Sequence, residues 1–136
     1  MSDGITLLGA GETNYQYDDP SSTMLETFPN PSKCTDSSSY DITFTSKEFT
    51  SLCPITGQPD FAEIDITYVP DEKCVETKSL KMYLFAYRNY QGFMEKVINK
   101  IADDLQEVLQ AKSLTVEGRF HPRGGIYPVI SAYRGK

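Results

Sequence analysis

Residues 93–108 read FMEKVINKIADDLQEV, and they carry the strongest periodicity in the chain. Apolar side chains recur there every three or four residues, at Phe93, Val97, Ile98, Ile101, Leu105 and Val108. This spacing places the apolar side chains on one stripe of a helix, with charged residues on the opposite side. The segment therefore predicts a long amphipathic helix whose stripe packs on a core.

Strand-type patterns lie on both sides of this helix. Apolar and polar residues alternate in three segments, at residues 40–45, 62–68 and 114–120, and residues 127–133 suit a fourth strand after the turn at residues 122–125. A shorter apolar-rich segment over residues 79–87 predicts a second helix. The order strand, strand, helix, helix, strand, strand indicates an α+β fold, with an antiparallel sheet and two helices on one face.

The chain has 136 residues, the length of one domain, so we expect a single domain over residues 1–136. Residues 1–39 are rich in Ser, Thr, Asn, Asp and Pro. This composition predicts an irregular N-terminal arm that packs on the domain or on a neighbouring subunit.

The composition excludes several classes of protein. Thirteen basic against 19 acidic residues give a net charge of −6, which argues against broad binding to a nucleic-acid backbone. No apolar run approaches the ~18 residues of a membrane helix, and the N-terminus does not resemble a signal peptide. We therefore expect a cytoplasmic protein. The odd count of three cysteines argues against a disulfide framework, and a single histidine argues against a metal site.

A cysteine in a stiff loop is the first candidate for chemistry. Pro54, Gly57 and Pro59 predict a structured loop over residues 48–60, and Cys53 lies inside it. A loop between two strands can present a thiolate to a cleft, where it can act as a nucleophile. Asp60 follows seven residues later, and a turn would bring its carboxyl back toward the sulfur, where it could move a proton.

Local features alone leave two interpretations of this loop open. A cysteine in a loop rich in Pro and Gly is more often structural than catalytic, and an Asp before a strand is more often a solvated cap. The longer sequence around the cysteine changes this balance.

Five segments resemble the QueF family of nitrile reductases. Residues 49–54 (FTSLCP) and 56–62 (TGQPDFA) are similar to the active-site stretch of that family. Its N-terminal segment, hallmark hexapeptide and late turn have counterparts in residues 25–30 (LETFPN), 76–81 (ETKSLK) and 122–125 (PRGG). The resemblance runs from about residue 24 to the end of the chain.

The resemblance implies a reaction. Members of the family reduce 7-cyano-7-deazaguanine to 7-aminomethyl-7-deazaguanine, a step toward the tRNA base queuosine, and consume two NADPH. Carried over to this chain, Cys53 is the nucleophile that adds to the nitrile carbon and forms a thioimide. Asp60 is the residue that donates and shuttles protons.

The resemblance also implies the residues that hold the substrate. Glu95 is expected to read the base, because a carboxylate accepts from a ring N–H and an exocyclic amino group together. Glu95 also suits the first turn of the predicted helix. Phe93 is expected to stack on the deazapurine, although its place in the apolar stripe equally predicts a core residue. The remaining substrate contacts implied by the family are Val75, Glu76, Thr77 and Met94.

A cofactor site and an assembly are implied in the same way. Lys78, Ser79, Lys81 and Arg123 correspond to residues that bind NADPH, and no Gly-x-Gly-x-x-Gly segment predicts a Rossmann site. The two lysines are three residues apart and would share a helix face, which is otherwise typical of a solvated basic edge. The family has the tunnelling fold. Its chains join into stacked rings, a decamer by expectation, with sites between subunits.

This sequence departs from the family at one important position. The residue before the base-reading glutamate is normally histidine, and here it is Met94, which cannot transfer a proton. Two alternatives therefore stay open beside the reductase. One is a QueF-like enzyme that adds ammonia to the nitrile base within tRNA and forms an amidine. The other is a binding protein that traps the nitrile without turnover. His121 is expected at the surface or a strand end, and a compensating role as proton donor is a further hypothesis.

Overall fold

The computed structural model describes residues 14–136, so the first part of the predicted arm lies outside the described residues. The helices are the 3-10 helix η1 (Ser22–Met24), α1 (Thr77–Phe85) and α2 (Met94–Leu109). The strands are β1 (Thr27–Pro29), β2 (Ile42–Leu52), β3 (Pro59–Val69), β4 (Lys73–Val75), β5 (Ser113–Phe120) and β6 (Val129–Gly135). None of these helices is long and apolar enough to cross a membrane.

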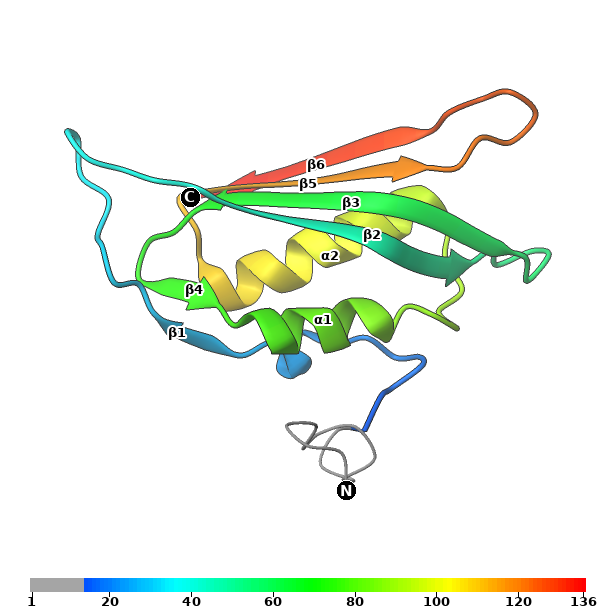
Figure 1. The fold of residues 1–136 in the computed structure, drawn as a ribbon, viewed down its shortest axis with the longest axis horizontal. Coiled ribbons are helices and arrows are strands. Elements are labelled where there is room, and N and C mark those ends of the chain that lie inside the picture. The colour runs from blue at the N-terminus through cyan, green and yellow to red at the C-terminus, as the bar shows by residue number, and fades with distance from the viewer. Residues whose placement is uncertain (1–13) are drawn as a thin grey trace, which may run out of the picture.

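Four strands form one antiparallel sheet in the order β2-β3-β5-β6, and β1 pairs with β4 in a separate two-stranded sheet. Both α1 and α2 lie on one face of the four-stranded sheet (Figure 1). The α+β prediction with two helices on one face is therefore confirmed. Strands β2 and β6 form the two edges of the sheet.

The loop predicted over residues 48–60 is wrong at both ends. Strand β2 continues to Leu52 and β3 begins at Pro59, so the loop spans only residues 53–58. The ladder has a bulge between Ser46 and Phe49, where Lys47 and Glu48 are both exposed. A bulge inserts one residue and shifts the alternation of buried and exposed side chains. Because of this shift, the sequence pattern did not predict the second half of the strand.

The core lies between α2 and the sheet. The buried face of α2 consists of Val97, Ile98, Ile101, Ala102, Leu105 and Leu109, as the helical stripe predicts. A Cβ atom added at Gly118 of β5 would lie 2.5 Å from Ile98 Cδ1, so the helix can approach the sheet this closely only because β5 has a glycine there. Phe93 precedes the helix and is 56% exposed, so its interpretation as a core residue is wrong.

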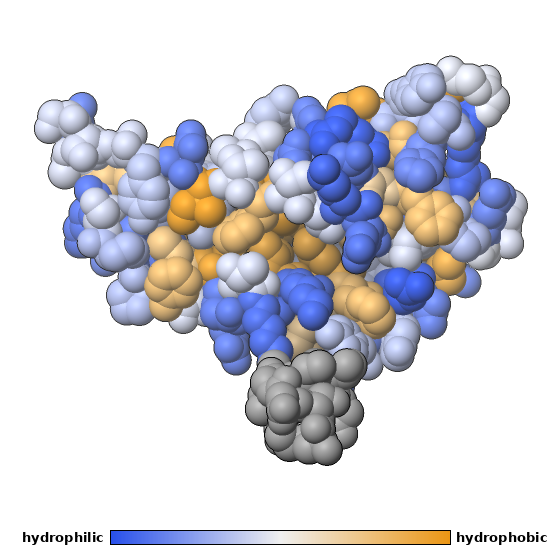
Figure 2. All heavy atoms as spheres, in the orientation of Figure 1, coloured by the Kyte–Doolittle hydropathy of each residue, from blue (hydrophilic) through white to orange (hydrophobic). Residues whose placement is uncertain are grey.

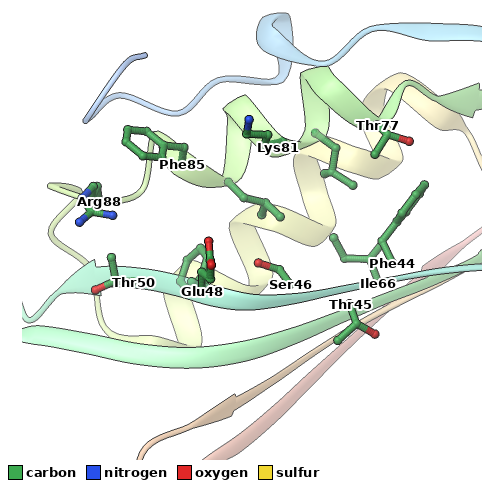
Figure 3. Close-up of a pocket in the computed structure, with 13 residues that line it drawn as sticks. Phe44, Thr45, Ser46, Glu48, Thr50, Ile66, Thr77, Lys81, Phe85 and Arg88 are labelled. Atoms are coloured by element: carbon green, nitrogen blue, oxygen red, sulfur yellow. The ribbon is translucent and has the colours of Figure 1, made fainter. Parts of the chain in front are cut away.

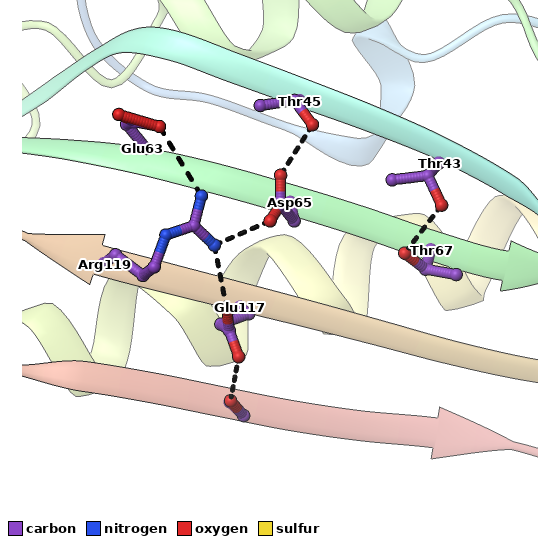
Figure 4. Close-up of polar contacts among 8 residues, drawn as sticks. Thr43, Thr45, Glu63, Asp65, Thr67, Glu117 and Arg119 are labelled. Carbon is purple, nitrogen blue, oxygen red and sulfur yellow. Dashed lines mark hydrogen bonds and ion pairs between the residues drawn. The ribbon is translucent and has the colours of Figure 1, made fainter.

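The opposite face of the sheet is polar. Arg119 of β5 pairs there with Asp65 of β3 at 2.6 Å and with Glu117 at 2.8 Å, and Thr45 of β2 donates to Asp65 at 2.6 Å (Figure 4). These contacts hold the pKa of the Asp65 carboxyl below its usual value, through the Thr45 hydrogen bond first and Arg119 second. Exposed ion pairs add little stability, so this network chiefly aligns the strands.

Candidate active site

The β2–β3 hairpin places the predicted nucleophile and the predicted proton donor on one face. Ser51 lies opposite Asp60 in the ladder, and the Cys53 N–H donates to the Gln58 carbonyl at 2.9 Å. Side chains two residues apart on a strand share a face, and so do directly opposed residues. Cys53 and Asp60 are therefore diagonal neighbours at the end of the sheet, and the hairpin loop is the turn that was predicted between them.

Cys53 lies half-buried in a hairpin turn that favours its thiolate. The Thr56 side chain hydrogen-bonds the sulfur and, with the Thr56 and Ile55 backbone N–H groups, lowers the pKa of the Cys53 thiol. Partial burial and the charge of Asp60 oppose this shift. The turn is closed by Gly57, which has a φ of 71° and donates its N–H to the Cys53 carbonyl at 2.9 Å. The turn thus fixes the backbone of Cys53 and favours the thiolate form of its side chain.

Asp60 is a buried carboxylate, with only 5% of its side chain exposed. Arg123, from the segment between β5 and β6, pairs with Asp60 Oδ1 through one guanidinium nitrogen. The Arg123 side chain is 43% exposed, so its other N–H groups remain available to an anion from solvent. The structure therefore gives Arg123 a contact with the predicted proton donor, in addition to its predicted contact with a cofactor phosphate.

The segment before α2 runs beside the cysteine. The Leu52 N–H donates to the Tyr90 carbonyl at 2.9 Å, and the Gly92 N–H donates back to the Leu52 carbonyl at 3.1 Å. This short parallel bridge carries Phe93 and Glu95 to the hairpin end. Phe93 exposes its ring there, and Glu95 lies exposed in the first turn of α2. An aromatic ring and a carboxylate on the segment that follows this bridge suit a planar base with N–H donors.

Met94 is partly buried and packs against the core. It stands where the resemblance implies a histidine, and a thioether cannot transfer a proton. The Asp60 carboxyl, the predicted proton donor, lies on the same face as Cys53.

The second group of predicted residues gathers at the start of α1. The Glu76 carboxylate caps this helix, accepting from the Lys78 and Ser79 N–H groups, each at 2.8 Å. These two bonds hold the pKa of Glu76 below its usual value. Val75 is buried and its N–H donates to the Tyr68 hydroxyl, while Thr77 is exposed.

Ser79 has a structural task at this position. Its hydroxyl donates to the Glu76 carbonyl at 2.8 Å and accepts from the Glu26 N–H at 2.9 Å. The side chain is buried and ties the N-terminal arm to α1. A cofactor contact through this hydroxyl would require both bonds to be exchanged.

A groove runs between α1 and strand β2. It has a volume of about 270 Å³ and is lined by apolar side chains that include Phe44, Phe49, Leu80 and Leu84. The space-filling view shows these apolar atoms in a hollow flanked by polar ones (Figure 2). The exposed residues Lys81 and Arg88 of the α1 segment border the groove beside Phe85, with Glu48 and Thr50 across from them on β2 (Figure 3).

The two groups of predicted residues lie apart within one chain. Cys53, Asp60 and Arg123 lie at the hairpin end of the sheet, whereas Glu76 and Thr77 lie near the β1–β4 side (Figure 1). The structure thus brings together the nucleophile, the carboxyl and the segment 93–95. It does not bring the α1 start to them.

Three residues of the site were assigned no role from the sequence. Thr56 lies three residues after Cys53, the spacing of a turn contact, and this was the available signal. Arg88 lies in the turn that follows α1 and borders the same groove as Lys81, and the helical pattern gave no signal for it. Ser51 gave no signal, because only the ladder register places it opposite Asp60.

His121 lies exposed at the end of β5, as its surface interpretation predicts, with its ring 5.8 Å from that of Phe61. No group of three or more His, Cys, Asp or Glu side chains within residues 14–136 is arranged to hold a metal ion.

Comparison with known proteins identifies relatives over most of the chain. Residues 59–136 match the family described as QueF-like protein. The chain is 55% identical to the NADPH-dependent 7-cyano-7-deazaguanine reductase of Streptococcus mutans, over 90% of this chain and 73% of that protein. It is 51% identical to the Bacillus subtilis protein of the same name, over 91% of this chain and 73% of the relative.

A solved structure shares the fold. The archaeosine synthase QueF-Like in its apo form superimposes with a TM-score of 0.62 at 16% sequence identity. The match covers 72% of this chain and 94% of that chain.

Proposed function

The chain belongs to the QueF family, and on that basis we propose that it reduces 7-cyano-7-deazaguanine with NADPH through a covalent bond to Cys53. The product is 7-aminomethyl-7-deazaguanine, a precursor of queuosine, and the reaction takes place in the cytoplasm. The observation that carries the mechanism is the position of Cys53 and Asp60 on one face of the β2–β3 hairpin.

The residues divide the chemistry between them. The Cys53 thiol gives its proton to the Asp60 carboxylate as its sulfur attacks the nitrile carbon, and Asp60 passes that proton to the nitrile nitrogen, so that a thioimide forms with no net change of charge. NADPH, when bound, supplies one hydride from each of two molecules. Cys53 leaves as a thiolate when the carbon–sulfur bond breaks, and Asp60, after it takes up a proton from solvent, gives that proton to the nitrogen as the amine forms.

The α1 segment fits the charge and shape of NADPH. Lys78 and Lys81 are three residues apart on α1, and Arg88 lies in the turn that follows this helix, so the segment carries three cationic side chains. Lys81 and Arg88 border an apolar groove, which suits a molecule with phosphates and flat rings. We assign phosphate binding to these cations and to the exposed part of Arg123, and no direct contact to Ser79.

The base is held by the segments around the hairpin end. Glu95 accepts hydrogen bonds from the edge of the deazapurine, Phe93 stacks on its face, and Met94 forms an apolar wall. Residues 75–77 supply contacts from the α1 start. In this arrangement the Glu76 side chain remains a helix cap and the backbone of the segment meets the base.

A complete site therefore requires two subunits. We propose that the Cys53 end of one chain meets the α1 start of its neighbour in a ring of the tunnelling fold, stacked in pairs. Both sheet edges, β2 and β6, are open to a neighbouring strand. Large apolar side chains are exposed around the hairpin end and on β6, at Ile55, Phe61, Ile126, Tyr127 and Val129. Such exposure is typical of a surface that a partner covers.

Mixed assemblies test the shared site. Chains with Cys53→Ala and chains with Lys78→Glu and Lys81→Glu are each expected to be inactive alone. When the two are co-expressed, random assembly gives about a quarter of the sites one native Cys53 end and one native α1 start. Activity near a quarter of the wild-type value is expected, measured on oligomers isolated by two affinity tags. Inactive mixed oligomers would show that each chain builds its whole site.

Met94 favours a second candidate. An enzyme that adds ammonia to the thioimide needs no proton coupled to hydride transfer, so the missing histidine would affect it less. The net charge of −6 argues against the tRNA substrate of such an enzyme. A trap without turnover would stop at the Cys53 adduct.

One experiment separates these functions. Intact mass is measured after 7-cyano-7-deazaguanine is added, and NADPH absorbance is then followed. A gain of one substrate mass on Cys53 followed by NADPH consumption is the expected result. If the adduct forms but NADPH absorbance does not change, even at a high NADPH concentration, the result would favour the ammonia-adding or trapping function. No adduct on the free thiol would remove Cys53 as the nucleophile.

A further inference from the structure

A buried hydroxyl without a partner lies beside the predicted proton donor. Ser51 is fully buried, and its Oγ has no hydrogen-bond partner among the residues that the structure describes. Buried hydroxyls are almost always paired, because an unpaired one loses its bonds to water without replacement. The unpaired hydroxyl of Ser51 is an exception, and it lies two residues before Cys53.

The ladder places this hydroxyl on the same face as Asp60. Ser51 and Asp60 are directly opposed in the β2–β3 register, two positions along the ladder from Phe49 and Ala62, which face the core. The Cβ atoms of opposed residues are about 5 Å apart, a gap that a serine hydroxyl and an aspartate carboxyl close by rotating about χ1. Arg123 binds Asp60 Oδ1, so Oδ2 is left for a second donor.

We propose that Ser51 positions Asp60 during catalysis, as the second hydrogen-bond partner of its carboxyl. A proton shuttle must be held in both of its protonation states. Arg123 can only donate, so it holds the ionised carboxylate but not the acidic proton of the neutral form. A serine hydroxyl donates to a carboxylate and accepts from a carboxylic acid, so rotation of Ser51 follows each proton that Asp60 takes up or releases.

This inference rests on the proposed function for its catalytic part, but the link between Ser51 and Asp60 can be measured without substrate. The charge of Asp60 raises the pKa of Cys53, so alkylation of Cys53 reports on that carboxylate. In the proposed arrangement the Ser51 hydroxyl rotates about χ1 and donates to the Asp60 carboxylate, so Ser51→Ala removes that donor and leaves the charge less dispersed. We expect the midpoint of the alkylation–pH profile to move upward, measured with iodoacetamide on the Cys53 peptide.

A double-mutant cycle distinguishes positioning from a general packing effect. Ser51→Ala is expected to slow formation of the nitrile adduct about tenfold in the wild-type background and to have no further effect with Asp60→Asn. Ser51→Thr, which keeps the hydroxyl, should restore most of the rate. Ser131→Ala, on β6 beside Glu117, serves as a matched control and should change neither measurement.

Two outcomes would overturn the proposal. One is an alkylation profile that Ser51→Ala leaves unchanged, and the other is a shift of equal size in the Asp60→Asn background. If the wild-type protein forms no nitrile adduct, the proposed function fails, and the alkylation profiles still decide whether Ser51 acts on Asp60.

Discussion

Replacing Cys53 with serine is expected to abolish the covalent adduct and to lower NADPH consumption about 10³-fold or more. A serine hydroxyl keeps the shape of the side chain but remains protonated near neutral pH, so it cannot add to a nitrile at a useful rate. The half-buried position of Cys53 in the turn lets serine fit without disturbing the hairpin. Intact mass and NADPH absorbance measure the two effects.

A partial version of the same test uses the groups that hold the thiolate. The Thr56 hydrogen bond is the first cause of the lowered pKa of Cys53, so Thr56→Val should raise that pKa toward the ordinary value. The lowered pKa keeps Cys53 ionised as the pH falls, so Thr56→Val, which raises the pKa, should move adduct formation to higher pH.

For the Cys53→Ser variant, an adduct that forms at the wild-type rate would locate the nucleophile elsewhere.

The long helix and the sheet could be predicted because their patterns are strong and local. The stripe along α2 has a period that only a helix satisfies, and the alternation in residues 62–68 and 114–120 matches buried strands β3 and β5. Strand β2 could be predicted only as far as its bulge, because one inserted residue reverses the alternation. Strands β1 and β4 are three residues long, too short to show a period.

The candidate site shows a similar limit. The distance along the chain from Cys53 to Asp60 suggested a turn, and the hairpin has one. The role of Glu76 as a helix cap and the ties made by the Ser79 hydroxyl depend on contacts between distant segments, such as the bond from the Glu26 N–H. Sequence resemblance names such positions, but it cannot tell which of their atoms are already bonded.

Arg123 illustrates how one side chain can serve two parts of the site. Its predicted role is to hold a cofactor phosphate, and its observed partner is the Asp60 carboxylate. The guanidinium has five N–H donors in a plane, so one edge can hold Asp60 while another faces solvent and an anion. In the proposed function, Arg123 would therefore link cofactor binding to the position of Asp60.

The second large effect is expected from Asp60→Asn, which should slow adduct formation and reduction about 10²- to 10³-fold. An amide has the size of the carboxyl, but it cannot act as a general acid or base near neutral pH. The nitrile nitrogen would then have to take its proton from water. The fold should survive, because Arg123 is partly exposed and can be solvated when its ion pair is lost. The rates are followed by stopped-flow absorbance and intact mass.

Asp65→Asn is the matched control, since it makes the same change on the same strand but on the polar face. It removes charge from the Arg119 network and is expected to leave both rates unchanged. Comparable rates in Asp60→Asn and the wild type would show that the proton comes from another group, and His121 would then be the next residue to replace. A loss of rate in both variants would instead point to the overall charge of the sheet. Only a loss confined to position 60 assigns the proton to the carboxyl that the hairpin places beside Cys53.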